Sequence, residues 1–225
     1  MNKPYIVCHM MMSVDGRIDC PMTEKLGGVE EYYNTLDFYK TNAHVSGKTT
    51  AKLEMAAKGC FTSSNDKKAN KELVFNNGKK VGCYEIVVDT KGTLLWNDNY
   101  DGSLLIILGE DVNLDYLNYL KERDISYIVT GKDKIDLNRA CEILSNDFNV
   151  TRMAVVGGGH INAGFLKAGL IDEVSILIGA GIDGREEMAS VFDGFSLDYP
   201  LTNLKLKDVQ KFDSDAVWIK YIVKK

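Results

Sequence analysis

The sequence predicts an α/β fold with a mixed, mostly parallel central sheet that ends in an antiparallel hairpin. Short apolar runs alternate with amphipathic stretches along most of the 225 residues, a pattern typical of α/β proteins. The C-terminal stretch differs, because Leu204-Lys-Leu-Lys207 alternates in polarity and a second apolar run begins at Val217. The turn residues Asp213-Ser-Asp215 lie between them, so these two runs are expected to pair as antiparallel strands.

Apolar runs mark the remaining strands, and helical periodicity marks the helices between them. The leucines at 114, 117 and 120 repeat with helical spacing, and the stretch ending at Ala168 stops at Gly169, where a left-handed cap is expected. Strands are predicted at 5–12, 44–46, 84–89, 104–108, 127–129, 153–156, 173–178 and 217–223, and helices at 30–39, 114–121, 137–144 and 161–168. Two segments lack a regular period: a lysine-rich stretch from Ala57 to Lys80, expected to be a flap or a solvated insertion, and the glycine-rich stretch 179–200.

Composition points to one globular domain spanning residues 1–225. The 27 basic and 32 acidic side chains give a net charge of −5, which favours neither nucleic acid nor an anionic membrane as a partner. No apolar run reaches the roughly 18 residues that a membrane helix needs, and no signal peptide is expected. Five scattered cysteines suit a reducing cytoplasm, and three histidines outside any ligand spacing predict no metal site.

The most informative stretch is a strand that runs through Gly157, Gly158 and Gly159 directly into a helix. Glycine leaves the backbone bare, so amide N–H groups can converge on an anion, and a helix N-terminus adds partial positive charge. This context predicts a site for a nucleotide pyrophosphate, although three glycines also form ordinary tight turns. The spacing is neither the GxGxxG of a Rossmann fold nor the GxxxxGK[ST] loop of a nucleoside triphosphatase.

A second glycine junction follows the predicted strand at 44–46. Gly47 precedes Lys48, Thr49 and Thr50, whose positive charge, hydroxyls and amides could all contact a phosphate. A threonine N-cap beside a surface lysine explains this stretch equally well by itself. Two such junctions at strand ends predict one dinucleotide spread along the carboxyl edge of the sheet.

A third stretch, Ser-Val-Asp-Gly-Arg-Ile, begins at Ser13 and contains an Asp-Gly turn signal after the first strand. The order of the three stretches resembles the dihydrofolate-reductase-like superfamily. Ser13, Asp15 and Gly16, with the run from Ala168 to Glu173, are most similar to its riboflavin-pathway branch, the reductase domain found at the C-terminus of RibD. The resemblance covers nearly the whole chain and implies a three-layer α/β/α oxidoreductase that uses NADPH. In that pathway it implies hydride transfer to a C=N carbon of 5-amino-6-(5-phosphoribosylamino)uracil.

The resemblance also assigns roles to individual residues. Gly47, Lys48 and Thr50 match the Gly-Arg-x-Thr motif that holds cofactor phosphates, with lysine in place of arginine. The glycine motif implies a cis peptide bond between Gly157 and Gly158. The implied cofactor-binding residues are Met11 and Met12, on the nicotinamide side, and Gly47, Lys48, Thr49, Thr50, Gly157, Gly158, Gly159, His160, Ile161 and Asn162. Members of this superfamily commonly form homodimers, so a cytoplasmic homodimer acting on a small heterocyclic substrate is expected.

The substrate side departs from the family pattern. Ser13, Asp15 and Val156 are implied to face the substrate, but riboflavin reductases usually carry glutamate where Val156 stands, and their Asp-Pro-x-Leu-x-x-Arg segment has no counterpart at 51–61. The candidate catalytic proton donors are Asp15 and the helical carboxylate Glu31, with water as a third source. Because Val-Gly-Gly-Gly is similar to the Ile-Gly-Gly-Gly of dihydrofolate reductase, a dihydrofolate- or pterin-type reductase is one alternative. A non-catalytic nucleotide-binding module is another.

Overall fold

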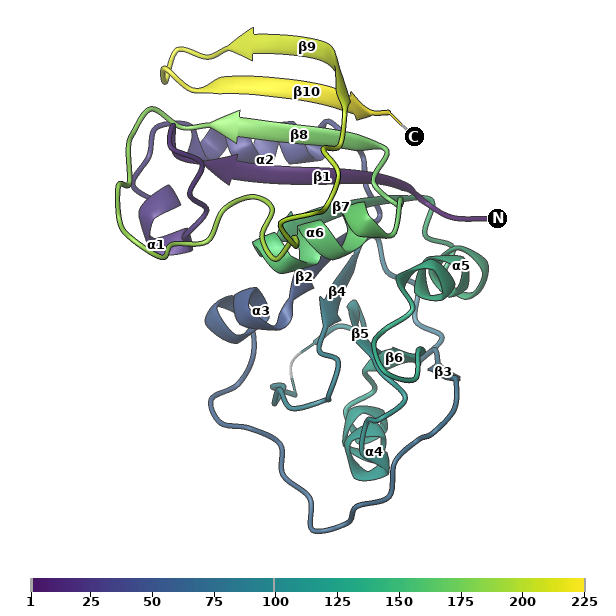
Figure 1. Ribbon diagram of the computed structural model, residues 1–225. Helices are drawn as coiled ribbons and strands as arrows, with labels where there is room; N and C mark the ends of the chain where they lie inside the picture. Colours follow the sequence, from purple (N-terminus) through teal and green to yellow (C-terminus); the bar gives the residue numbers. More distant parts are fainter. Residues whose placement is uncertain (1, 99, 225) are drawn as a thin grey trace. The chain divides into compact units, whose positions relative to one another are not determined.

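The computed structural model describes residues 2–98 and 100–224. These residues form two compact units: unit 1 comprises residues 2–4 and 42–151, and unit 2 comprises 5–41 and 152–224. Each unit has five β-strands, and each contains helices that pack on its strands (Figure 1). The expected α/β class with mostly parallel strands is confirmed.

In unit 2, strand β1 (Tyr5–Met12) lies between β7 (Arg152–Gly157) and β8 (Glu173–Ile178) and is parallel to both. Strand β10 (Val217–Val223) is antiparallel to β8, and β9 (Leu204–Lys211) is antiparallel to β10 at the end of the row. The predicted C-terminal hairpin is therefore confirmed. β9 is an edge strand whose eight residues are all exposed.

Helices cover both faces of the unit 2 sheet. α2 (Val29–Asp37) lies behind β1 and β8, α6 (Gly159–Lys167) lies in front of β7, and the short α1 (Cys20–Thr23) precedes α2 (Figure 1). Side chains alternate between the faces of a strand, so Val7 and Met11 of β1 share the α2 side, where they join an apolar cluster. That cluster also contains Tyr39, Leu177, Ala216 and Trp218.

In unit 1 the strand order is β3, β6, β5, β4, β2. β2 (Ala43–Gly47), β4 (Tyr84–Val88), β5 (Leu104–Leu108) and β6 (Ser126–Val129) are parallel, and β3 (Leu73–Phe75) is antiparallel to β6. All five side chains of β5 are apolar and buried, as a strand covered on both faces requires.

Two helices of unit 1 begin at a residue whose side chain caps the helix. The Asn113 side chain accepts a hydrogen bond from Asp115 N at the start of α4 (Leu114–Glu122). The Asp136 side chain accepts one from Arg139 N at the start of α5 (Leu137–Asp147). The shorter α3 (Lys48–Glu54) begins directly at the end of β2 and has no side-chain cap.

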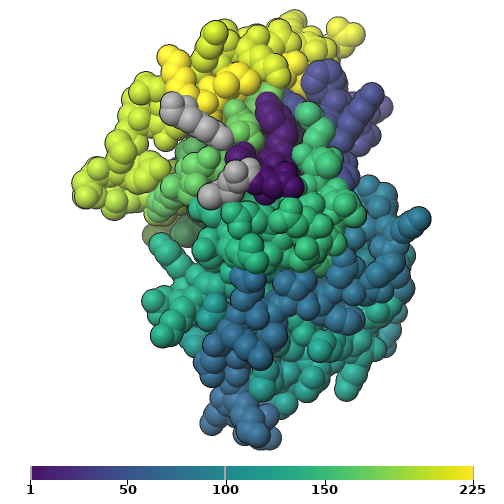
Figure 2. Space-filling model, turned by 90° about the vertical axis from the view of Figure 1, so that its right-hand side faces the viewer, coloured from purple at the N-terminus to yellow at the C-terminus, as the bar shows by residue number. Residues whose placement is uncertain are grey.

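The structure confirms most predicted elements and corrects one segment. β1, β5, β8 and β10 have the predicted bounds, and Gly169 has the left-handed conformation expected of a helix cap, with φ +67°. The stretch from Ala57 to Lys80, expected to have no regular structure, contains β3, and Ala69 N donates to Val112 O where this segment lies against the unit 1 core. Figure 2 shows the blue part of this segment running over the teal surface of unit 1. None of the described helices is long and apolar enough to cross a membrane.

Candidate active site

The candidate residues of unit 2 lie where its parallel strands end. β1, β7 and β8 run in the same direction, so their carboxyl ends lie at one edge of their sheet. After β1 the chain makes a turn at residues 13–18, after β7 it passes Gly158 into α6, and after β8 it forms a long segment over residues 179–194. We call these the first turn, the glycine junction and the covering segment.

The glycine junction presents backbone donors at the start of α6. Ile161 N and Asn162 N both donate to the carbonyl of Gly158, at 3.0 and 3.1 Å. The first turn of a helix leaves its leading N–H groups without an acceptor inside the helix, and here these belong to Gly159 and His160. The helix dipole adds partial positive charge at this end. N–H groups in this position are the kind that can contact an anion.

The backbone torsion of Gly158 makes the turn between β7 and α6. Its φ of +48° and ψ of 150° lie in a region that only glycine adopts readily. The peptide bond between Gly157 and Gly158 is trans, because no cis bond occurs among the described residues. The implied cis peptide is therefore wrong for this structure, in which the glycine torsion alone redirects the chain.

The covering segment packs directly onto the glycine junction. Asp193 N donates to Gly159 O at 3.1 Å, and a Cβ on Gly159 would lie only 2.4 Å from the carbonyl oxygen of Ser190. The fully buried Asn162 side chain donates to Val191 O at 2.7 Å, whereas its Oδ1 has no partner among the described residues. Gly159 and Asn162 thus hold the covering segment in place. Sequence reasoning missed this role, because nothing local marks Asp193 or Val191 as neighbours of the motif.

The first turn is held by the carboxylate of Asp15. This carboxylate accepts hydrogen bonds from Ser13 Oγ at 2.6 Å and from the backbone N–H groups of Asp183 and Gly184, both at 2.9 Å. Ser13 Oγ also accepts from Arg17 N at 3.0 Å. The hydrogen bond from Ser13, followed by those from the two backbone amides, holds the pKa of Asp15 well below its usual range. An ionised carboxylate can accept a hydrogen bond at neutral pH but has no proton to donate.

The other candidate residues of unit 2 occupy separate surroundings. Met11 is 7% exposed in the apolar cluster beside α2, and Val156 is half-buried one residue before Gly157. Glu31 is half-buried in the first turn of α2, where a negative charge is favourable to the helix dipole. The described residues show no hydrogen bond between the two candidate proton donors, Glu31 and Asp15.

In unit 1, the lysine of the second glycine junction already contacts other side chains. β2 ends at Gly47 and α3 begins at Lys48, whose ammonium lies 3.7 Å from the carboxylate of Asp89 and donates to Thr93 Oγ1. Asp89 is 1% exposed and accepts from Thr93 N at 2.6 Å and from Leu94 N at 2.9 Å. Asp89 follows β4, the parallel neighbour of β2, which brings the two strand ends together. The sequence signal was its place at the end of the predicted strand 84–89.

The two threonines of this junction are accessible. Thr49 is exposed and Thr50 is half-buried in the first turn of α3. Their hydroxyls can therefore reach a ligand from solvent, as can the exposed Lys48.

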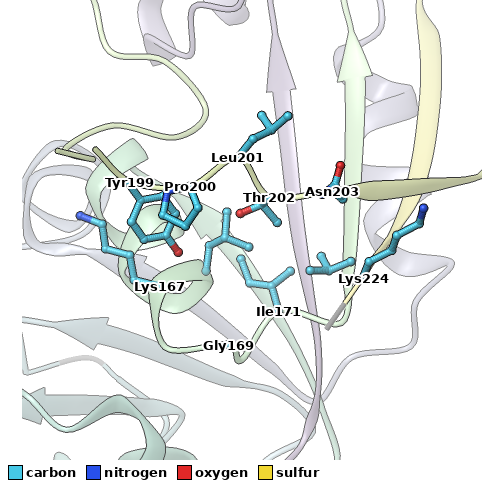
Figure 3. A pocket seen from close by; sticks show the side chains of 11 residues that line it. Lys167, Gly169, Ile171, Tyr199, Pro200, Leu201, Thr202, Asn203 and Lys224 are labelled. Atoms are coloured by element: carbon cyan, nitrogen blue, oxygen red, sulfur yellow. The ribbon is translucent and has the colours of Figure 1, made fainter. Parts of the chain in front are cut away.

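A hollow of about 830 Å³ in unit 2 lies away from the glycine junction. It is at the opposite end of α6, where Lys167, Gly169 and Ile171 face the stretch from Tyr199 to Asn203 (Figure 3). The Lys167 ammonium lies 6.0 Å from the centre of the Tyr199 ring. This hollow contains none of the residues that the sequence assigned to the cofactor or the substrate.

Residues 4–218 match the family model described as the RibD C-terminal domain, which covers almost the whole chain. The chain belongs to this family. The RibD C-terminal domain family is a reductase family of riboflavin biosynthesis whose members use NAD(P)H and act on a small molecule. The resemblance inferred from the three stretches is thereby confirmed.

Solved structures show the same fold at low sequence identity. A pyrimidine reductase-like protein from Corynebacterium diphtheriae is 17% identical with a TM-score of 0.74, and the match covers 100% of this RibD C-terminal domain and 93% of that chain. The riboflavin biosynthesis reductase Rib7 from Saccharomyces cerevisiae is 19% identical with a TM-score of 0.62, covering 100% and 91%. RibD from Acinetobacter baumannii is 14% identical with a TM-score of 0.69, and the present chain spans 59% of it.

Proposed function

We propose that this RibD C-terminal domain is an NADPH-dependent reductase acting on 5-amino-6-(5-phosphoribosylamino)uracil or a closely related heterocycle. The glycine junction carries this proposal, because its bare N–H groups lie at the carboxyl edge of parallel strands, where a pyrophosphate can be held. NADPH, when bound, would supply a hydride to the C=N carbon of the substrate. The substrate nitrogen takes up a proton, so that an imine becomes an amine and NADP⁺ is released.

The roles of the chain's own residues follow from their surroundings. Within unit 2, the amides of Gly159 and His160 would bind a pyrophosphate. Within unit 1, Lys48, Thr49 and Thr50 would bind a phosphate group, as the family motif implies. Asp15, kept ionised by its three donors, would accept a hydrogen bond from the substrate. We therefore assign the proton to water rather than to Asp15.

We further propose that the chain acts as a single cytoplasmic reductase domain and forms a homodimer. One family model spanning 4–218 supports the single domain, and the absence of any disulfide among the five described cysteines supports a reducing compartment. Support for pairing comes from unit 2, where β9 is an exposed edge strand and Leu201 and Leu206 are 87% and 54% exposed. A monomer in light scattering at working concentration would contradict the dimer.

Calorimetry with NADPH and NADH, followed by NADPH consumption with candidate substrates, tests the proposed function. We expect tight NADPH binding and turnover of the phosphoribosylamino-pyrimidine. No heat with either nucleotide would overturn the cofactor assignment. Binding without turnover of any heterocycle would favour a nucleotide-binding module instead.

One observation favours a second candidate, a dihydrofolate- or pterin-type reductase. Val156 is apolar and half-buried where riboflavin reductases usually carry glutamate, so this position offers no carboxylate to a ribose phosphate substrate. Turnover of dihydrofolate in preference to the phosphoribosylamino-pyrimidine would decide for this alternative.

A further inference from the structure

Three potential metal ligands come together in unit 1 at the amino ends of two parallel strands. His44 lies near the start of β2, and its register partner on β4 is Glu85. Cys83 precedes Glu85 by two residues and lies in the bend that leads into β4. The parallel pairing of β2 with β4, together with the bend before β4, therefore brings an imidazole, a thiol and a carboxylate close to one another.

The distances within this group suit a tetrahedral ion. His44 Nδ1 lies 3.3 Å from Glu85 Oε1, and the ligand atoms of all three residues lie within 4.8 Å of one another. Nitrogen and oxygen ligands about 2.0 Å from a zinc ion and separated by the tetrahedral angle lie about 3.3 Å apart. The imidazole and the carboxylate thus already have the required separation, and a change of side-chain rotamer could bring the sulfur close.

The chemistry of the group also favours metal binding. Imidazole nitrogen, thiolate sulfur and carboxylate oxygen are the three kinds of ligand atom that protein zinc sites use. The side chains of His44 and Glu85 are 23% and 46% exposed, so an ion can enter from solvent.

We propose that His44, Cys83 and Glu85 bind one Zn²⁺ ion or a similar divalent metal ion, with water as the fourth ligand. Thiolate and imidazole select a transition metal over calcium or magnesium, which prefer oxygen ligands alone. The spacing of the histidines in the sequence predicts no metal site. Such a site could not be recognised there, because its ligands are some forty positions apart and only the pairing of β2 with β4 brings them together.

This site is separate from the proposed cofactor site. Within β2, His44 lies near the amino end, whereas Gly47 and Lys48 follow at the carboxyl end about 10 Å further along the strand. The ion would therefore cross-link β2 and β4 and stabilise unit 1. It would not take part in hydride transfer. The inference is independent of the proposed function.

Cobalt titration of the full chain, freed of metal with a chelator, tests the site. We expect one Co²⁺ per chain, a thiolate-to-cobalt absorption band, and displacement of Co²⁺ by Zn²⁺. Cys83→Ser should abolish the band, and His44→Gln should weaken Zn²⁺ binding by about 100-fold. Cys60→Ser is the matched control, since Cys60 is an exposed cysteine of the same unit and should leave both properties unchanged.

Thermal unfolding with and without Zn²⁺ provides an independent readout. Zn²⁺ should raise the melting temperature of the wild type and of Cys60→Ser but not of Cys83→Ser, because only a bound ion stabilises the folded state. Circular dichroism establishes that each variant is folded. Unchanged Zn²⁺ affinity in Cys83→Ser, or no cobalt binding by the wild type, would overturn the proposal.

Discussion

The phenol of Tyr39 donates a 2.7 Å hydrogen bond to the carboxylate of Glu173, a side chain with no solvent exposure. Tyr5 donates a second hydrogen bond at 2.8 Å, and the ammonium of Lys207 lies 2.7 Å from the same carboxylate. Burial would raise the pKa of this carboxyl group, but the three donors outweigh burial and hold the pKa of Glu173 below its ordinary value. One buried carboxylate on β8 thus connects β1, β9 and the residues after α2.

Replacing Glu173 should change how stability depends on pH. A carboxyl group whose pKa is lower in the folded state stabilises the fold above its unfolded pKa, and this contribution is lost as pH falls through the folded pKa. We expect Glu173→Gln to lower the free energy of unfolding at pH 7 by about 1–3 kcal/mol. The difference from the wild type should shrink in acid.

Urea unfolding at neutral and acidic pH measures this effect. Glu24→Gln is the control, because Glu24 is exposed in the same unit. If Glu173→Gln lost as much stability in acid as the wild type does, the carboxylate would not carry the predicted contribution.

Placing a carboxylate in the glycine junction should abolish NADPH binding. Gly158→Asp puts a negative charge beside the N–H groups of Gly159 and His160 that are proposed to hold the pyrophosphate. Calorimetry should show at least about a 100-fold weaker affinity, because the new carboxylate repels the pyrophosphate and competes with it for the N–H groups. Gly169→Asp is the control, since it adds the same charge after α6 at a left-handed position with open space. Unchanged affinity in folded Gly158→Asp would refute the phosphate assignment.

Lys48→Ala should weaken the binding of NADPH more than the binding of NADH. If the Lys48 ammonium contacts the 2′-phosphate, its removal should weaken NADPH binding by about tenfold, the cost of a hydrogen bond to a charged group, and leave NADH binding nearly unchanged. Lys52→Ala is the control, because Lys52 is exposed on the same helix. Equal losses for NADPH and NADH would reject this role, as would be expected if Lys48 serves only its ion pair with Asp89.

Gly159→Ala should destabilise unit 2 by crowding the covering segment. A Cβ at this position would lie 2.4 Å from Ser190 O and 2.8 Å from the Asp193 carboxylate, so the backbone has to shift. We expect a loss of about 1–3 kcal/mol in the free energy of unfolding. Gly82→Ala is the control, because a Cβ there meets nothing within 4 Å. A melting temperature equal to that of the wild type would mean that the segment is not held against the junction.

The sequence by itself determined the features that local chemistry controls. Long apolar runs predicted β1, β5 and β8 to the residue, and the hairpin followed from alternation around a turn at Asp213–Asp215. Glycines without a Cβ predicted the junction at 157–159 and the cap at Gly169, and Gly158 and Gly169 have the positive φ that other residues avoid. Motif order along the chain was enough to identify the family.

Tertiary structure decided everything that depends on which distant segments meet. The three-residue β3 is too short to show a period, and it forms because Phe75 pairs beside Tyr127 on β6. Asp193 of the covering segment lies against Gly159 because the chain reverses after β8. Asp89 lies beside Lys48, and Glu85 beside His44, because β2 pairs with β4. Local propensity carries no information on register between segments tens of residues apart, so these neighbours, and the trans peptide at Gly157, emerged only from the folded chain.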